Sequence, residues 1–308
     1  MLAPNHISES VRETTAGWVI SDRIIISHRP TWDSNQLCWS DGQGSFYNLS
    51  DAPNPLPPSQ PLSPTSPIKK VYEAGGIAAT WKFGDVFLKL RDLGPSELQA
   101  TREHVTLSQL HDRGDLSFII PDVLFHALWG NRYMMLLKAV PGRTLGEEWP
   151  SMDEDTKTYY VDRVVGICKE LETWVADYIG GVDGHHLADN YLIKRGAPLD
   201  YTNKNLVSNC TNIGMDCSVF HFYHCDLGPG NIIVNLADRS IGIIDWETAG
   251  FVPKEWIRTK FRVSGGMDLP GSDDQQYRLD WRRRVQLKLG TEGFPEVVDR
   301  WFPWWDGR

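Results

Sequence analysis

The sequence predicts an α+β protein in two lobes, a small lobe of antiparallel strands followed by a larger, mostly helical lobe. Short β-branched runs separated by glycine turns lie between residues 68 and 90, and a long helical periodicity starts near residue 151. With 308 residues, 41% of them hydrophobic, the chain can bury the core of one large domain or of two lobes. We expect residues 1–67 to form an N-terminal extension with a Pro-rich linker, 68–140 the small lobe and 141–308 the large lobe.

The N-terminal extension has two parts. The segments Trp18–Ser27 and Cys38–Leu49 contain apolar patches that fit either strands or a helix. The segment 52–67 contains seven prolines, which exclude a helix or a central strand and indicate a linker or surface loop. Its Pro-x-x-Pro pattern makes it a candidate for weak partner binding, although a plain spacer is the favoured interpretation.

The small lobe is predicted from a β-meander over residues 71–90, followed by strands at 118–123 and 133–140. Lys89 lies within the apolar run 86–90, where a lysine usually marks the solvated face of a strand. A functional role is the alternative. Pro141 and Gly142 end the last strand and mark the crossing to the next lobe.

Helices are predicted on both sides of this crossing. Residues 96–110 read as a helix with a capping box at Ser96, and Glu103 then lies on or near its buried stripe. A buried carboxylate needs a partner, and Lys89 is the natural candidate. Residues 151–178 form the clearest helix, again with a capping box, at Ser151. Further helices are expected at 253–261 and 272–289, and an irregular loop at 180–218.

The stretch 220–250 carries the chemistry. Residues 232–234 and 241–244 read as two strands of a hairpin, which would bring Asp226, Asn231 and Asp245 to one edge. Oxygen ligands of this kind suit Mg²⁺ with a bound phosphate. His224 precedes them in the pattern His-x-Asp-x-x-x-x-Asn, and Asp245 follows Asn231 by 14 residues. The same spacing occurs in the catalytic loop of kinases and the metal-binding Asp that follows it.

Phosphoryl transfer assigns a separate role to each of these side chains. Asp226 suits the catalytic base that receives the proton of the acceptor hydroxyl, and His224 suits a catalytic-loop residue that braces rather than reacts. Asn231 and Asp245 suit the Mg²⁺ ligands. Lys89, held by Glu103, suits the cation that binds the phosphates of ATP.

With these residues in place, the sequence resembles the aminoglycoside phosphotransferase and choline kinase-like family, and more closely the phosphotransferase family proteins of fungi. The resemblance covers roughly residues 68–308. It rests on the segments VFLKL (86–90), TREHVTLSQL (101–110), YMMLLKAVPGRTL (133–145), FYHCDLGPGNIIV (222–234) and IIDWETAGFVPKEWIRTK (243–260). The His-Arg-Asp, Asp-Phe-Gly and Ala-Pro-Glu segments of protein kinases do not occur in this sequence.

The resemblance implies a bilobal protein-kinase-like fold, with a small antiparallel-sheet lobe plus one helix and a larger helical lobe. It implies ATP and Mg²⁺ as cofactors and the roles given above for Asp226, Asn231, Asp245, Lys89 and Glu103. It also implies a hinge over the stretch 136–139, whose backbone at residues such as Leu137 and Ala139 reads the adenine.

The expected function is therefore an ATP-dependent kinase for a small-molecule hydroxyl. A non-catalytic nucleotide-binding scaffold and an enzyme of adenylyl transfer remain as alternatives. The net charge of −9 argues against a general nucleic-acid surface. No apolar run reaches the ~18 residues of a membrane span, and no signal-peptide pattern opens the sequence, so we expect a cytoplasmic protein.

Overall fold

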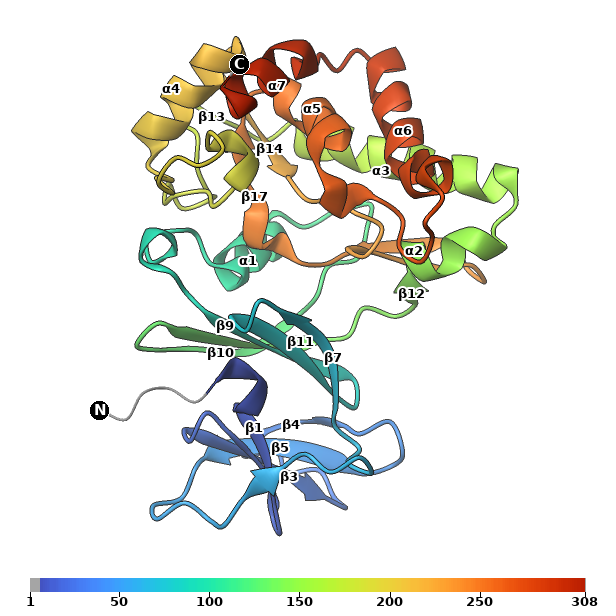
Figure 1. Cartoon of the computed structure of the whole chain (residues 1–308). Coiled ribbons are helices and arrows are strands. Elements are labelled where there is room, and N and C mark those ends of the chain that lie inside the picture. The colour runs from blue at the N-terminus through green and yellow to red at the C-terminus, as the bar shows by residue number, and fades with distance from the viewer. Residues whose placement is uncertain (1–5, 308) are drawn as a thin grey trace. The chain divides into compact units, whose positions relative to one another are not determined.

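The computed structural model describes residues 6–307, which divide into two compact units (Figure 1). The first unit contains the residues up to Gly94 together with Asp122–Ala139, and the second contains Pro95–Pro121 together with the chain from Val140 onward. Antiparallel sheets make up the first unit, and the seven α-helices of residues 6–307 belong to the second, which confirms the predicted α+β class. Within residues 6–307, every helix is too short or too polar to cross a membrane.

The first unit contains a five-stranded antiparallel sheet. Its strands, in spatial order, are β10 (Val123–Trp129), β11 (Arg132–Lys138), β9 (Val86–Asp92), β8 (Ala78–Phe83) and β7 (Lys69–Ala74). The predicted β-meander is confirmed. The strand predicted from residue 118 begins only at Val123, because Ile119 instead bridges to Gly242 within the second unit.

The N-terminal residues form a second antiparallel sheet in the same unit. After the 3-10 turn η1 (Ile7–Glu9), the six strands lie in the order β4 (Leu37–Ser40), β5 (Phe46–Asp51), β3 (Ile24–Arg29), β2 (Gly17–Ile20), β1 (Val11–Thr14) and β6 (Gln60–Pro61). The apolar patches that fitted strand or helix are therefore strands. Pro61 lies on the edge strand, where a residue without an N–H group is tolerated.

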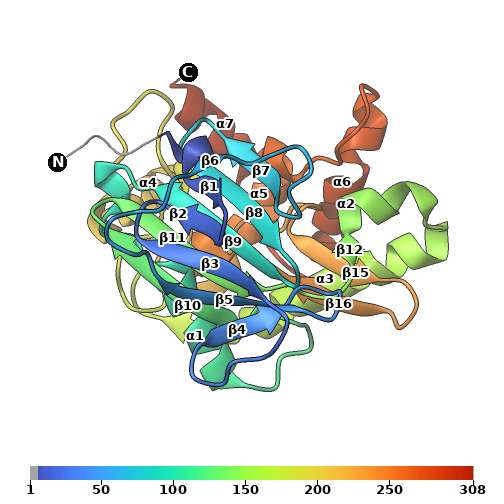
Figure 2. The ribbon, with the colours of Figure 1, turned by 90° about the horizontal axis from the view of Figure 1, so that it is seen from below.

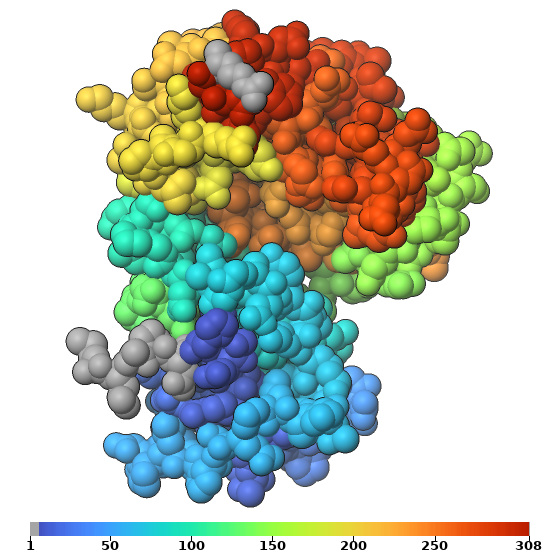
Figure 3. Space-filling model, viewed as in Figure 1, coloured from blue at the N-terminus to red at the C-terminus, as the bar shows by residue number. Residues whose placement is uncertain are grey.

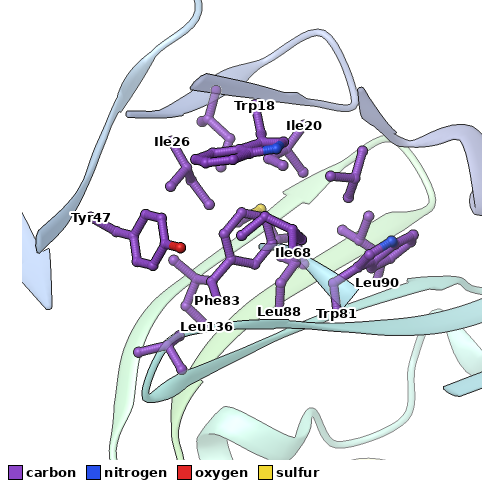
Figure 4. Packing of buried hydrophobic residues seen from close by; sticks show 14 of the residues in the cluster. Trp18, Ile20, Ile26, Tyr47, Ile68, Trp81, Phe83, Leu88, Leu90 and Leu136 are labelled. Carbon is purple, nitrogen blue, oxygen red and sulfur yellow. The ribbon is translucent and has the colours of Figure 1, made fainter. Parts of the chain in front are cut away.

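These two sheets share one hydrophobic core, so the prediction of a separate N-terminal extension differs from the structure. The ring of Trp18 packs edge-to-face against the rings of Tyr47 and Phe83, with ring centroids 5.7 Å and 5.9 Å apart (Figure 4). Ile26 and Leu88 are fully buried in the same cluster. Figure 2 shows β1–β5 lying over the five-stranded sheet, and Figure 3 shows the dark blue N-terminal residues adjoining the cyan strands β7–β9.

Polar contacts strengthen this joint core. The buried Arg132 guanidinium in β11 donates to the Ser10 hydroxyl at 3.0 Å. It also forms a bidentate ion pair with the Asp92 carboxylate, through two hydrogen bonds of 2.8 Å. The Pro-rich segment is also held in place, because the N–H of Ser63 donates to the Glu13 carboxylate in β1 at 3.1 Å. Its predicted role as a partner site stays a prediction.

The second unit contains two small sheets and seven α-helices among the described residues. The sheets are β12 (Arg143–Thr144), β15 (Ile232–Asn235) and β16 (Ser240–Ile243) in one, and β13 (Val175–Ala176), β14 (Phe220–His224) and β17 (Ala249–Val252) in the other. The helices are α1 (Glu103–Arg113), α2 (Leu145–Glu148), α3 (Glu154–Leu171), α4 (Asn203–Ile213), α5 (Glu255–Val263), α6 (Gln275–Thr291) and α7 (Val298–Asp306). Short 3-10 turns are η2 (Pro95–Glu97), η3 (Trp149–Ser151), η4 (Asn190–Leu192), η5 (Trp246–Thr248) and η6 (Gly265–Met267).

Two predicted helix starts were wrong. Helix α1 begins at Glu103 rather than near Ser96, because Arg102 is extended and Thr101 donates its N–H to the carbonyl of His186 at 3.0 Å. Helix α3 is capped by Asp153, whose carboxylate accepts the N–H of Thr156 at 2.8 Å.

Helix α4 lies in the segment that was predicted to be an irregular loop. Its buried residues Leu206, Cys210 and Ile213 follow helical spacing, and Thr202 caps its first turn. The helix sequence NKNLVSNCTNI is rich in asparagine, which has low helix propensity and hides this pattern. The unit boundaries differ in the same region, since residues 95–121 belong to the second unit and the crossing falls between Ala139 and Val140.

The shared core predicts that residues 1–67 contribute to the stability of the first unit. Trp18→Ala removes a large side chain that is 6% exposed, and we expect it to lower the free energy of unfolding by about 3–5 kcal/mol. Trp32→Ala is the matched control, because Trp32 is 55% exposed and should cost less than about 1 kcal/mol. Urea unfolding of both variants measures the difference, and equal losses would contradict the shared core.

Candidate active site

The β15–β16 hairpin positions Asn231 and Asp245 at one end. Ile232 and Ile243 lie opposite each other in the two strands and are fully buried. Asn231 directly precedes β15, and its carbonyl accepts the N–H of Ile244 at 3.0 Å. Asp245 follows as the next residue. The predicted hairpin and the shared edge of these two residues are therefore present in the structure.

Asp226 lies in the loop between β14 and β15 and is bound to Asn231. The amide nitrogen of Asn231 donates to the Asp226 carbonyl at 2.8 Å and to Asp226 Oδ2 at 3.2 Å. Both partners are acceptors, so the NH₂ group of Asn231 must face Asp226. The carbonyl oxygen of the Asn231 side chain then faces away from Asp226.

His224 connects the loop of Asp226 to the residue before Asp245. Its Nδ1 accepts the N–H of Asp226 at 3.2 Å, and its Nε2 lies 2.9 Å from the carbonyl of Ile244. Since Nδ1 accepts from an amide and Nε2 faces an acceptor, the neutral tautomer with the proton on Nε2 satisfies both. The imidazole is fully buried, and burial lowers its pKa although Asp226 opposes the shift. These contacts make His224 a brace between two parts of the site.

Asp245 has a left-handed backbone with φ of +67° and ψ of 56°, which is uncommon for a residue other than glycine. The residues on either side are held by hydrogen bonds. Ile244 is bound through its carbonyl to His224 and through its N–H to Asn231, and the N–H of Trp246 donates to Glu103 Oε1 at 3.1 Å. A strained backbone persists where its surroundings fix it, which is common at functional sites.

Glu103 lies at the start of helix α1 and is only 2% exposed. The prediction placed it on or near the buried stripe, and it lies on that stripe with Thr106, Leu107 and Leu110. Its position in the first turn also suits a negative charge, because the amino end of a helix carries a partial positive charge. Its contact with Trp246 was not foreseen, since the two residues are 143 positions apart in the sequence.

A buried ion pair near Asp226 was missed by the sequence analysis. Lys260 in α5 binds Asp189 at 2.6 Å, and the side chains are only 4% and 1% exposed. Trp256 also donates to Asp189, at 2.9 Å. Asp189 lies in the segment 180–218, which was predicted to be an irregular loop. The sequence does contain one indication of a buried ion pair. Lys260 lies one helical turn after Trp256, on the apolar side of α5, where a charged side chain needs a partner.

The electrostatic surroundings of Asp226 have opposing effects. Burial raises the pKa of the Asp226 carboxyl, whereas the positive charge of Lys260 opposes this shift. Asp245 and Asp189 act in the same direction as burial. The carboxyl is thus held in a partly desolvated environment with a fixed cation in the vicinity.

The remaining predicted site residues belong to the first unit. Lys89 lies in β9 on the face opposite Leu88 and Leu90, which are buried in the core shared with the N-terminal sheet. Its pairing with Glu103, which belongs to the second unit, stays a prediction. Leu137 lies within β11, paired on both sides, and the N–H of Ala139 already donates to the Asp85 carbonyl at 2.7 Å. The contact of Leu137 and Ala139 with the adenine stays a prediction.

No family model and no curated protein matches the sequence. Among solved structures, the chain is similar to an aminoglycoside phosphotransferase from Streptomyces rimosus, with a TM-score of 0.47 and 15% identity over 76% of this chain and 92% of that one. It is similar to an aminoglycoside-3'-phosphotransferase of type VIII, with a TM-score of 0.47 and 16% identity over 76% and 94% of the two chains. For an ethanolamine kinase from Plasmodium vivax the TM-score is 0.39 and the identity 13%, over 80% and 83%. Since these TM-scores lie below 0.5, the function proposed below rests on the residues of the site.

The buried, neutral His224 predicts a loss of stability in mild acid. Its folded pKa lies below the ordinary value of 6.5, so the unfolded chain binds the extra proton as the pH falls through that value. We expect the free energy of unfolding to fall by about 1 kcal/mol between pH 6.5 and 5.5, and this slope to be smaller in His224→Gln. Replacing the exposed His126 with Gln is the control that should keep the wild-type slope. An unchanged slope in His224→Gln, measured by urea unfolding at both pH values, would contradict the assignment.

The contact between Glu103 and Trp246 predicts different effects for two substitutions. Glu103→Ala leaves the buried N–H of Trp246 without this acceptor and should cost about 1–3 kcal/mol of stability. Glu103→Gln keeps an oxygen acceptor and loses only the charge, so it should cost less than about 1 kcal/mol. Equal losses in the two variants, measured by thermal or urea unfolding, would show that the charge matters rather than the hydrogen bond.

Proposed function

We propose that this chain is a phosphotransferase that moves the γ-phosphate of ATP to a hydroxyl group of a small molecule. The proposal rests on one observation: hydrogen bonds connect Asp226, Asn231 and the residue before Asp245. Asn231 is bound to Asp226 directly, and its carbonyl holds the residue before Asp245. A base and two oxygen ligands of different charge therefore share one rigid edge, which is what phosphoryl transfer requires.

Asn231 and Asp245 are the residues that would hold Mg²⁺. Their side chains offer one neutral and one anionic oxygen, and hard oxygen ligands of this kind suit that ion. When bound, the ion supplies positive charge against the phosphate oxygens. Lys89 remains the proposed cation for the ATP phosphates, and Leu137 and Ala139 the proposed neighbours of the adenine.

Asp226 acts as the general base in this proposal. It orients the acceptor hydroxyl and receives its proton while the hydroxyl oxygen bonds to the γ-phosphorus and the bond to the β–γ bridging oxygen breaks. Burial raises the pKa of this carboxyl, which brings the base closer to neutral pH, where general-base catalysis is most effective. His224 holds Asp226 by its backbone N–H and takes no part in proton transfer.

Replacing Asp226 with Asn tests the proposal. The variant keeps the size of the side chain but loses the base, so we expect phosphoryl transfer to fall by about 10²–10⁴-fold while Mg·ATP binding is retained. The assay incubates the protein with Mg·ATP and a panel of small hydroxyl compounds and identifies the products by mass. Asp155→Asn, an exposed aspartate in the first turn of α3, is the control that should keep wild-type turnover.

The outcomes of this assay separate the alternatives. Turnover that is unchanged in Asp226→Asn would exclude the proposed base. Mg·ATP binding by calorimetry without any turnover by the wild-type protein would favour a non-catalytic nucleotide-binding protein. A product heavier by AMP rather than by a phosphoryl group would indicate adenylyl transfer.

A further inference from the structure

The segment that follows helix α5 packs against the loop of Asp226. A Cβ atom placed on Gly228 would lie 2.6 Å from the carbonyl oxygen of Gly266, so the two backbones are in direct contact. The indole of Trp281 in α6 donates to the carbonyl of Leu227, the residue before Gly228, at 3.3 Å. The residues from Ser264 to Leu269, here called the glycine wall, therefore border the proposed catalytic loop.

The glycine wall is firmly held by its own contacts. The N–H of Ser264 donates to the Lys260 carbonyl at 2.9 Å, and the N–H of Leu269 donates to the Arg278 carbonyl at 2.8 Å. Asp268 forms ion pairs with Arg282 at 2.6 Å and with Arg278 at 3.0 Å. The wall is thus a fixed surface rather than a loose loop.

Two glycines are the exposed part of this wall. Gly265 and Gly266 are accessible to solvent, whereas Ser264 and Met267 on either side are buried. Neither glycine has a left-handed backbone, so an alanine fits the main chain at both positions. What differs between them is what a side chain would meet.

Only Gly266 faces the proposed base. A Cβ atom on Gly266 would lie 3.7 Å from Asp226 Oδ1 and 3.5 Å from the Ser264 hydroxyl, whereas a Cβ on Gly265 would have nothing within 4 Å. Oδ2 of Asp226 accepts the Asn231 amide, so Oδ1 is the carboxylate oxygen that faces this space. A hydroxyl group placed over Gly266 would therefore reach the base and the Ser264 hydroxyl together.

We propose that Gly266 forms the floor on which the hydroxyl-bearing carbon of the acceptor lies, and that Ser264 is a further acceptor-binding residue. This inference rests on the proposed phosphotransferase function. The absence of a side chain at Gly266 sets how much bulk the acceptor can carry next to its reacting oxygen. Water, which has no carbon, needs none of this room.

The test compares two acceptors in one reaction. The wild-type protein, Gly266→Ala and Gly265→Ala are incubated with Mg·ATP in water that contains glycerol, and glycerol phosphate and inorganic phosphate are both measured. Because a small displacement of a reacting group has a large effect on transfer, we expect the ratio of glycerol phosphate to phosphate to fall at least about tenfold in Gly266→Ala. In Gly265→Ala, the matched control, the ratio should stay within about twofold of wild type, as for a distant surface change. Equal ratios in the two variants would overturn the inference.

A second variant and a second readout keep the inference separate from the proposed function. Ser264→Ala should also lower the ratio of glycerol phosphate to phosphate, mainly by raising KM for glycerol. If thermal unfolding shows that Gly266→Ala is misfolded, the result for Ser264→Ala decides whether the inference holds. If the wild-type protein neither hydrolyses ATP nor phosphorylates glycerol, choline or homoserine, the proposed function fails, and this inference fails with it. If it hydrolyses ATP but phosphorylates none of these alcohols, or if both variants keep the wild-type ratio, only the acceptor floor is overturned.

Discussion

The site depends on one constraint, the left-handed backbone of Asp245. This conformation is unfavourable for a residue with a side chain, and hydrogen bonds to Ile244 and Trp246 compensate for it. His224, Asn231 and Glu103 supply these bonds from three separate elements. The two proposed metal ligands and the proposed base are therefore parts of a single hydrogen-bonded assembly.

The first unit depends on a different principle. A sheet with one apolar face needs a second layer, and here the N-terminal strands provide it (Figure 4). Val86, Leu88 and Leu90 of β9 face this core, which leaves Lys89 on the opposite face of the strand. The orientation of the proposed phosphate-binding lysine thus follows from the packing of residues that are far from it in the sequence.

The sequence was sufficient to predict the parts of the protein that are local. The hairpin around Asp226, Asn231 and Asp245 lies within about twenty residues, so strand period and turn residues define it. The layer formed by the N-terminal strands could not be predicted, because contacts such as that between Ser10 and Arg132 join residues 122 positions apart. The pair of Lys260 and Asp189 was missed for the same reason, and α4 was missed because its asparagines conceal its apolar stripe.

The order of the chain has a consequence for synthesis on the ribosome. The chain leaves the first unit at Gly94 and returns at Asp122, and the intervening helix α1 belongs to the second unit. The Glu103 carboxylate of that helix meets Trp246 only after another 143 residues have been made. At about 5–20 residues per second this takes on the order of ten seconds. Until then, helix α1 lacks the contact with Trp246 that it makes in the folded protein.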